Sequence, residues 1–111
     1  MYHEEEDQEA FLVLLGECLL IVEGEERQLK QWDFFHCPPH TKHVFVGAGD
    51  GPCTLLAMGS RSNKGAIYPV DEVAIQHNAG VKEETNTGDV AYKGVEPPKP
   101  TEFEPSWLPG G

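Results

Sequence analysis

The sequence is short of basic residues and contains no long apolar run. Only 8 residues are Lys or Arg against 19 that are Asp or Glu, which gives a net charge of −11 at pH 7. Nucleic acids and anionic membranes are bound by clustered Lys and Arg side chains, so this balance argues against both as partners. No stretch approaches the roughly 20 apolar residues of a membrane span, and no charged-then-apolar signal peptide opens the sequence. We therefore expect an acidic protein whose charge serves solubility.

Cysteine is scarce as well. The three cysteines, Cys18, Cys37 and Cys53, are odd in number, and none belongs to a CxxC pair of the kind that binds zinc. We expect free thiols that pack as small apolar side chains in a reducing, cytoplasmic compartment.

What the sequence does contain is a series of short apolar segments separated by turn residues. A chain of 111 residues is large enough for one domain with one core. Short strands with frequent turns are typical of antiparallel sandwiches and barrels, and Gly16 and Gly24 predict tight hairpin turns. The expected strands are Glu9–Leu15, Glu17–Val22, Glu25–Lys30, Asp33–His36, His43–Val46 and Cys53–Met58. The continuously apolar Cys18–Val22 predicts a central strand that is covered on both faces.

The character of the chain changes after residue 60. Ser60–Gly65 predicts a loop, and Asp71 is placed to cap a short helix, Glu72–His77. From Lys82 onward the chain holds five of its nine prolines together with aromatic residues, a composition that cannot build its own core. We therefore expect residues 1–60 to form the β-domain and residues 61–111 to form a loop, a helix and an extended strap that packs on it or on a partner subunit.

Two clusters of potential metal ligands flank the first strands. His3 and five carboxylates occupy the seven residues from His3 to Glu9, and the run HCPPHTKH extends from His36 to His43. A charge run of this kind is most often a solvated acidic loop, and a histidine two residues from a chain end is prone to fraying. The alternative is that the clusters meet across the fold and bind a ligand.

The spacing within these clusters resembles the cupin superfamily, in particular small single-domain bacterial cupins. The first cupin motif is a glycine, His-any-His, a glutamate three or four residues on, and a glycine after six more residues. His3, Glu9 and Gly16 match its first histidine, glutamate and closing glycine, and Glu5 stands where the second histidine is expected. In the second motif, Pro-any-Gly followed by a histidine, Pro38 and His43 match and a histidine replaces the glycine.

The resemblance covers roughly residues 2–60 and implies a fold, a site and a cofactor. The implied fold is all-β, a cupin-like antiparallel β-barrel of the jelly-roll type, here with one short helix and a proline-rich C-terminal tail. Cupins usually carry further strands before the first histidine, which are missing from this sequence. Missing strands would leave open sheet edges, so we expect a homodimer, with exchanged segments as one way to form it.

The implied site joins His3, Glu9 and His43 around one divalent transition metal, with Mn, Fe, Ni and Zn as candidates. Glu5 would act as a fourth ligand or hydrogen-bond a metal-bound water. The other histidines of the second cluster, His36 and His40, are expected at the surface or behind the ligands.

A pocket for a small organic molecule is expected beside the metal. Phe11, Val13 and Phe45 share parity with the ligands along their strands and should line the barrel interior, with Tyr2 at its rim. The leading hypothesis is a metal-binding cupin, acting as an oxygenase, isomerase or lyase if it is catalytic. The alternative is a non-catalytic barrel that binds a ligand or mediates dimerisation without metal.

Overall fold

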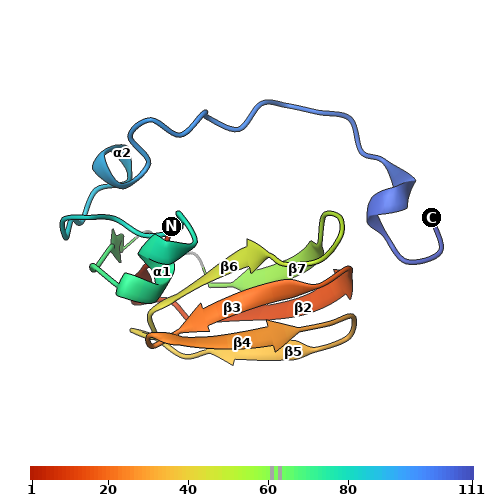
Figure 1. Cartoon of the computed structure of the whole chain (residues 1–111), viewed down its shortest axis with the longest axis horizontal. Helices are drawn as coiled ribbons and strands as arrows, with labels where there is room; N and C mark the ends of the chain where they lie inside the picture. The colour runs from red at the N-terminus through yellow and green to blue at the C-terminus, as the bar shows by residue number, and fades with distance from the viewer. Residues whose placement is uncertain (61, 63) are drawn as a thin grey trace.

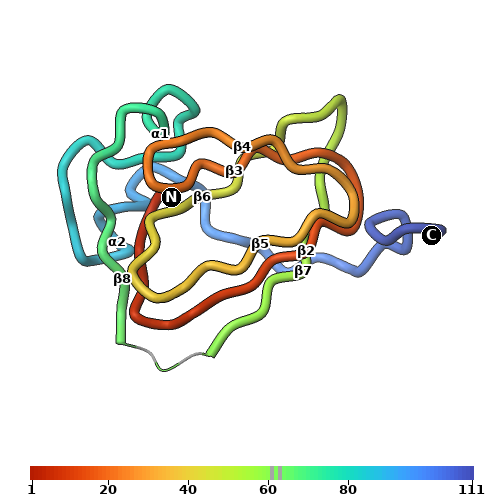
Figure 2. Tube along the Cα trace, turned by 90° about the horizontal axis from the view of Figure 1, so that it is seen from below, coloured from red at the N-terminus to blue at the C-terminus, as the bar shows by residue number. Residues whose placement is uncertain are grey.

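The structure is a computed structural model that describes residues 1–60, 62 and 64–111 and has an antiparallel β-fold. Two three-stranded sheets, in the orders β5-β2-β7 and β4-β3-β6, lie face to face (Figure 1 and Figure 2). A two-residue ladder, β1 with β8, stands beside them. The strands are β1 Glu4–Glu5, β2 Glu9–Leu15, β3 Cys18–Val22, β4 Glu25–Leu29, β5 Phe34–Cys37, β6 His43–Gly47, β7 Thr54–Gly59 and β8 Ala66–Ile67.

The predicted all-β, cupin-like antiparallel fold is confirmed. Each of the six expected strands is present within one residue of its predicted ends. Among the described residues the ladders form separate sheets, and they do not close into a continuous ring. The arrangement is therefore a sandwich-like version of the barrel.

The two predicted glycine turns are present and explain why glycine is needed there. Gly16 has φ +78°, and a Cβ added to it would lie 2.6 Å from the carbonyl oxygen of Pro52, so a side chain fits neither the backbone angle nor the space. Glu23 and Gly24 have φ +49° and +77°, the pair of positive angles that a type I′ hairpin turn requires.

The space between the sheets is filled by aromatic and aliphatic side chains. Val13 of β2 is fully buried, and Phe11 on the same face of β2 is 8% exposed. The ring centroid of Phe11 lies 4.5 Å from that of Phe45 on β6 and 6.4 Å from that of Phe35 on β5. This cluster joins the two sheets directly beneath the predicted metal ligands.

The outer face of the β4-β3-β6 sheet is covered by helix α1, Glu72–Gln76 (Figure 2). Leu19 and Ile21 of β3 point to this side and form one buried cluster with Ala74 of the helix and Tyr2. The strand β3 is thus central and covered on both faces, as its continuous apolar run predicts. The helix begins as expected, because the Asp71 carboxylate accepts a hydrogen bond from the backbone N–H of Ala74 at 2.9 Å.

The remaining C-terminal residues contain two further short helices, α2 Gly88–Ala91 and the 3-10 helix η1 Pro105–Trp107, which the sequence did not predict. Residues 92–108 are exposed, and in Figure 1 they run along the molecule to its far end. Docking of this strap on a partner subunit stays a prediction. The loop predicted at Ser60–Gly65 includes residues 61 and 63, which lie outside the described residues. In the described part of the chain, every helix is too short or too polar to cross a membrane.

Candidate metal centre

His3 and His43 are brought together by backbone pairing. The two residues form an antiparallel β-bridge in which each backbone N–H donates to the other's carbonyl, at 3.1 Å from His3 and 2.9 Å from His43. His43 opens strand β6, and its side chain points between the sheets, where it is almost fully buried. The imidazole centroids lie 4.7 Å apart. Two histidines separated by forty residues in the sequence are therefore neighbours in the fold.

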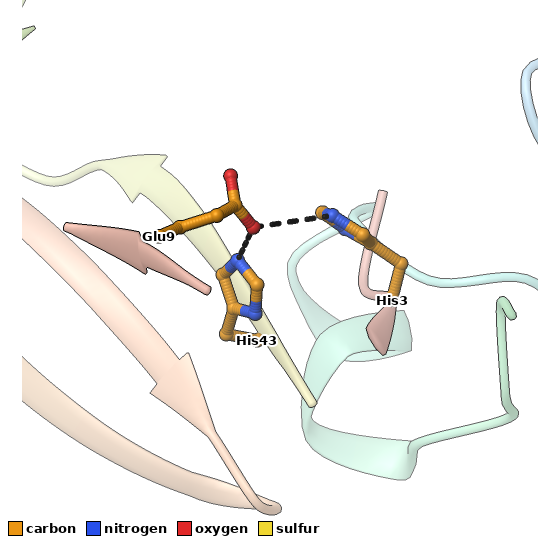
Figure 3. Close-up of side chains that lie close together, drawn as sticks. All are labelled: His3, Glu9 and His43. Atoms are coloured by element: carbon orange, nitrogen blue, oxygen red, sulfur yellow. Dashed lines mark ion pairs between the residues drawn. The ribbon is translucent and has the colours of Figure 1, made fainter. Parts of the chain in front are cut away.

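Glu9, at the start of β2, completes a three-residue group (Figure 3). Its Oε1 lies 3.1 Å from Nε2 of His43 and 4.0 Å from Nε2 of His3. One potential ligand atom from each of the three residues lies within 4.8 Å of the others. The structure thus brings together the three residues that the cupin resemblance implies as metal ligands.

The tautomers of both histidines are determined by backbone carbonyls. Nδ1 of His3 lies 2.8 Å from the carbonyl oxygen of Met1, and Nδ1 of His43 lies 2.8 Å from that of Thr41. A carbonyl oxygen only accepts hydrogen bonds, so Nδ1 carries the hydrogen in each ring. In the neutral rings Nε2 therefore presents a lone pair, and both Nε2 atoms face Glu9. Metal-binding histidines are oriented in this way by partners on their second nitrogen.

Without a cation, the carboxylate of Glu9 is poorly satisfied. Its Oε1 is buried and has no hydrogen-bond partner. An ion pair with His43 would need that imidazole to be protonated, but burial lowers the pKa of His43 below its usual value and favours the neutral ring. When both rings are neutral, three lone-pair atoms converge with no proton between them. Two imidazoles and a carboxylate are a suitable donor set for a divalent transition metal, and a metal ion would satisfy the orphaned oxygen.

The predicted fourth residue, Glu5, lies on the edge of the group. Its Oε1 is 3.2 Å from Nε2 of His3, but it is not among the three residues whose ligand atoms converge. The side chain is 31% exposed, so it contacts both the site and solvent. Of the histidines expected outside the ligand set, His36 contacts the Gln8 side chain and His40 lies 3.6 Å from a carboxylate oxygen of Glu4.

The four residues predicted to line the pocket lie in two different places. Phe11, Val13 and Phe45 face the interior as expected, and the ring of Phe11 lies 5.7 Å from that of His43. Tyr2 is placed on the opposite side of β3, in the cluster under α1, where its hydroxyl accepts a hydrogen bond from the Gly24 N–H at 3.1 Å. Tyr2 therefore anchors the segment that carries His3.

An open cleft of about 400 Å³ lies next to the candidate ligands. It is lined by Glu5, Asp7, Glu9, Ala57, Met58, Gly59, Ser60 and Gly65. Asp7 accepts hydrogen bonds from the backbone N–H of Ser62 at 3.1 Å and from the Ser60 hydroxyl at 3.3 Å. These bonds, those from Ser62 first, lower the pKa of Asp7 and keep it ionised. A molecule in this cleft would meet carboxylates and a hydroxyl beside the ligands.

Sequence reasoning missed the residues that the second half of the chain brings to the site. Tyr68 follows β8, and its ring lies 5.8 Å from that of His3. Ser60 and the end of β7 form one wall of the cleft. No motif contains these residues, and only the pairing of β1 with β8 and of β2 with β7 brings them close.

Comparison with known proteins agrees with this geometry. The family model described as Cupin domain matches residues 1–59. A similar solved structure is the crystal structure of a "Putative sugar phosphate isomerase" from Acidithiobacillus ferrooxidans, with a TM-score of 0.54 and 26% sequence identity. The match covers 60% of this chain and 43% of that one, so this chain corresponds to less than half of that protein. No curated protein matches the chain.

Proposed function

This chain belongs to the cupin family, and we propose that it binds one divalent transition-metal ion through His3, Glu9 and His43 and isomerises a small hydroxylated molecule in the adjacent cleft. The observation that carries the proposal is the convergence of two oriented Nε2 lone pairs on a buried carboxylate oxygen that has no other partner. Mn, Fe, Ni and Zn all accept this donor set. A cytoplasmic location belongs to the same proposal.

Isomerisation is the best supported of the three reaction classes. The structural neighbour carries the name of an isomerase, although it is a longer protein. In addition, the cleft contains a carboxylate suited to moving a proton, because Glu5 is partly exposed and lies beside the ligands. Asp7 suits this role less well, since its hydrogen bonds favour the ionised form and reduce its basicity.

Each side chain then has a distinct role. When bound, the metal ion would polarise a carbonyl or hydroxyl oxygen of the substrate. His3 and His43 would hold the ion through Nε2, and the Met1 and Thr41 carbonyls keep both rings in the tautomer that this requires. Glu5 would take the C–H proton from the hydroxyl-bearing carbon next to the substrate carbonyl and return it to the carbonyl carbon, while the hydroxyl proton passes to the former carbonyl oxygen. The Ser60 hydroxyl, at the cleft wall, is placed to contact a substrate hydroxyl.

The first experiment measures metal uptake. Protein stripped with a chelator is titrated with Mn²⁺, Fe²⁺, Ni²⁺ and Zn²⁺, and bound metal is counted after desalting. We expect about one ion per chain for the wild type and for His40→Ala, the matched control at an exposed histidine outside the group. His43→Ala should lose this binding. Failure of the wild type to retain any of the four ions would overturn the proposed site.

The second experiment isolates the proton transfer. The metal-loaded protein is incubated in D₂O with a panel of aldoses and ketoses, with and without a phosphate group, and deuterium uptake next to the carbonyl is followed by NMR. We expect exchange with the wild type and its loss in Glu5→Gln, which should still retain metal. Exchange at the wild-type rate in Glu5→Gln would remove Glu5 from this role.

The competing function is a non-catalytic barrel, and one observation favours it. Phe11, Phe35 and Phe45 fill the space between the sheets, so a ligand would be confined to the open cleft. Such a protein would retain small molecules without deuterium exchange, and its ligand binding would be unchanged in His43→Ala.

A further inference from the structure

The outer face of the β5-β2-β7 sheet presents a largely apolar surface. Alternate residues of three adjacent strands point to this side, and their register places them in two rows across the sheet. The first row is Phe34, Leu12 and Leu56, and the second is His36, Ala10 and Met58. We call these six residues the outer patch. None of them is an acidic residue, a lysine or an arginine, although the whole chain has a net charge of −11.

The two sheets differ in what covers them. The corresponding face of the β4-β3-β6 sheet is buried beneath α1, which packs on Leu19 and Ile21. Over the outer patch no described helix is present (Figure 2), and Phe34, Leu56 and Met58 are 59%, 44% and 46% exposed. The largest apolar patch on a protein monomer is typically about 300–600 Å², and such a patch is often an interaction site.

We propose that the outer patch is the surface through which a second copy of this chain binds, in an isologous dimer with the two β5-β2-β7 sheets face to face. The distribution of charge indicates which surface two copies would use. Two chains that each carry a net charge of −11 repel one another, so they associate most readily through a surface without carboxylates. The outer patch provides such a surface on three adjacent strands.

The shape of the patch also suits pairing with itself. The first row places three large side chains side by side, whereas the second has the small Ala10 between His36 and Met58. A hollow of about 300 Å³ lies over this second row, and Gln8, Glu9, Gly59 and Ser60 also line it. In a two-fold arrangement the projecting row of one copy meets the receding row of the other.

The available area is sufficient for a stable dimer. Because a fully exposed large apolar residue presents on the order of 200 Å², the patch with its half-buried members offers roughly 400 Å² of apolar surface per copy. Two facing copies would bury about 800 Å² of apolar surface. Since interfaces are about 60–65% apolar, the total with a polar rim is about 1,300 Å², within the range of specific interfaces.

The experiment measures the oligomeric state by sedimentation velocity and light scattering at about 50 µM protein. We expect the wild type at twice the chain mass of 12.3 kDa. Phe34→Glu and Leu56→Glu place charges on either side of Leu12 within the buried surface, so both should weaken dimerisation at least about 100-fold and give monomers with unchanged circular dichroism. The control is Phe103→Glu in the C-terminal tail, at an aromatic residue that is 62% exposed, which should remain dimeric.

Three outcomes would overturn the proposal. They are a monomeric wild type at this concentration, dimers in both outer-patch variants, or dissociation caused by Phe103→Glu alone. The last result would assign dimerisation to the tail. Metal retention, measured on the same samples, should be the same in wild type and in Phe34→Glu, which keeps this test independent of the proposed metal site.

Discussion

Replacing Glu9 with glutamine should stabilise the metal-free protein and destabilise the metal-loaded protein relative to wild type. In the metal-free protein, Oε1 of Glu9 is buried without a hydrogen-bond partner and lies 3.1 Å from Nε2 of His43. The amide of glutamine has the same shape, carries no charge and offers two N–H donors. With its nitrogen at the Oε1 position, it can donate a hydrogen bond to the lone pair of His43.

The magnitude follows from the cost of the orphaned oxygen. A buried polar group without a partner costs about 1–3 kcal/mol, so satisfying it should raise the free energy of unfolding of the metal-free protein by about 1 kcal/mol. For a domain of about 100 residues this raises Tm by about 4–8 °C. Bound metal should reverse the order of the two proteins, because an ion at 100 times its Kd stabilises the wild type by about 2.7 kcal/mol. Glutamine removes the anionic ligand, so most of this gain should disappear.

The assay is thermal unfolding followed by circular dichroism, once with EDTA and once with a 100-fold excess of the metal over its Kd. The rank order of wild type and Glu9→Gln should reverse between the two conditions, while His40→Ala should follow the wild type in both. If Glu9→Gln unfolds below the wild type in EDTA, the carboxylate is satisfied without metal. If it gains as much from metal as the wild type, Glu9 is not a ligand. Either result would refute the reasoning.

Three further predictions concern the rest of the fold. Burial, followed by the charge of Asp71, raises the pKa of Tyr2 to about 12 from 10.0. As the pH rises, the Tyr2 hydroxyl therefore loses its proton in the unfolded chain before it does so in the folded protein. The free energy of unfolding should fall between pH 10 and 12 by at most about 1.4 kcal/mol per pH unit. Urea unfolding should show this slope in the wild type and not in Tyr2→Phe. Gly16→Ala should cost at least about 2 kcal/mol in the same assay, because a Cβ there would lie 2.6 Å from a backbone oxygen at positive φ. Burial raises the pKa of Cys18 to about 12 and of Cys37 to about 11, so iodoacetamide at pH 8 should leave both thiols unmodified until the protein unfolds, as intact mass would show.

The β-sandwich could be predicted because its signals are local. The short apolar run in Glu9–Leu15 predicts strand β2, parity with Glu9 assigns Phe11 and Val13 to its inner face, and Gly16 and Gly24 predict the hairpin turns that follow. The ladder of β1 with β8 could not be predicted, since it joins two pairs of residues sixty positions apart with no periodic pattern. The same holds for the cleft, because Ser60 reaches it only through the pairing of β7 with β2.

The meeting of His3, Glu9 and His43 was predictable from motif spacing, but the reason why His40 replaces the glycine of the second motif was not. His40 has φ +62°, the left-handed conformation that glycine adopts without strain. Its side chain is exposed, and its backbone N–H donates to the carbonyl of Glu5 at 2.7 Å. The backbone conformation that glycine would favour is thus retained with a histidine in that place, and the turn still delivers His43 to the site.

The position of His3 depends on contacts far from the candidate metal centre. Beside its bridge to His43, the terminal segment is fixed by Tyr2, whose ring is buried under α1 and whose backbone N–H donates to the carbonyl of Ala79 at 2.7 Å. The terminal amine also donates to the hydroxyl of Tyr92 at 2.8 Å. The fraying expected of a residue so close to the chain end is therefore opposed by the second half of the chain.

This dependence gives a last prediction. Truncating a buried aromatic residue costs about 3–5 kcal/mol, and in Tyr2→Ala this loss falls on the segment that carries His3. We expect calorimetric titration to show metal affinity weakened at least about tenfold, because the competent position of His3 is then only partly populated. Tyr2→Phe keeps the buried ring and should bind as the wild type does, and far-UV circular dichroism checks that β2–β7 remain folded. Wild-type metal affinity in Tyr2→Ala would show that the backbone bridge to His43 is enough to hold His3 in place. The C-terminal half of the chain would then contribute stability without shaping the site.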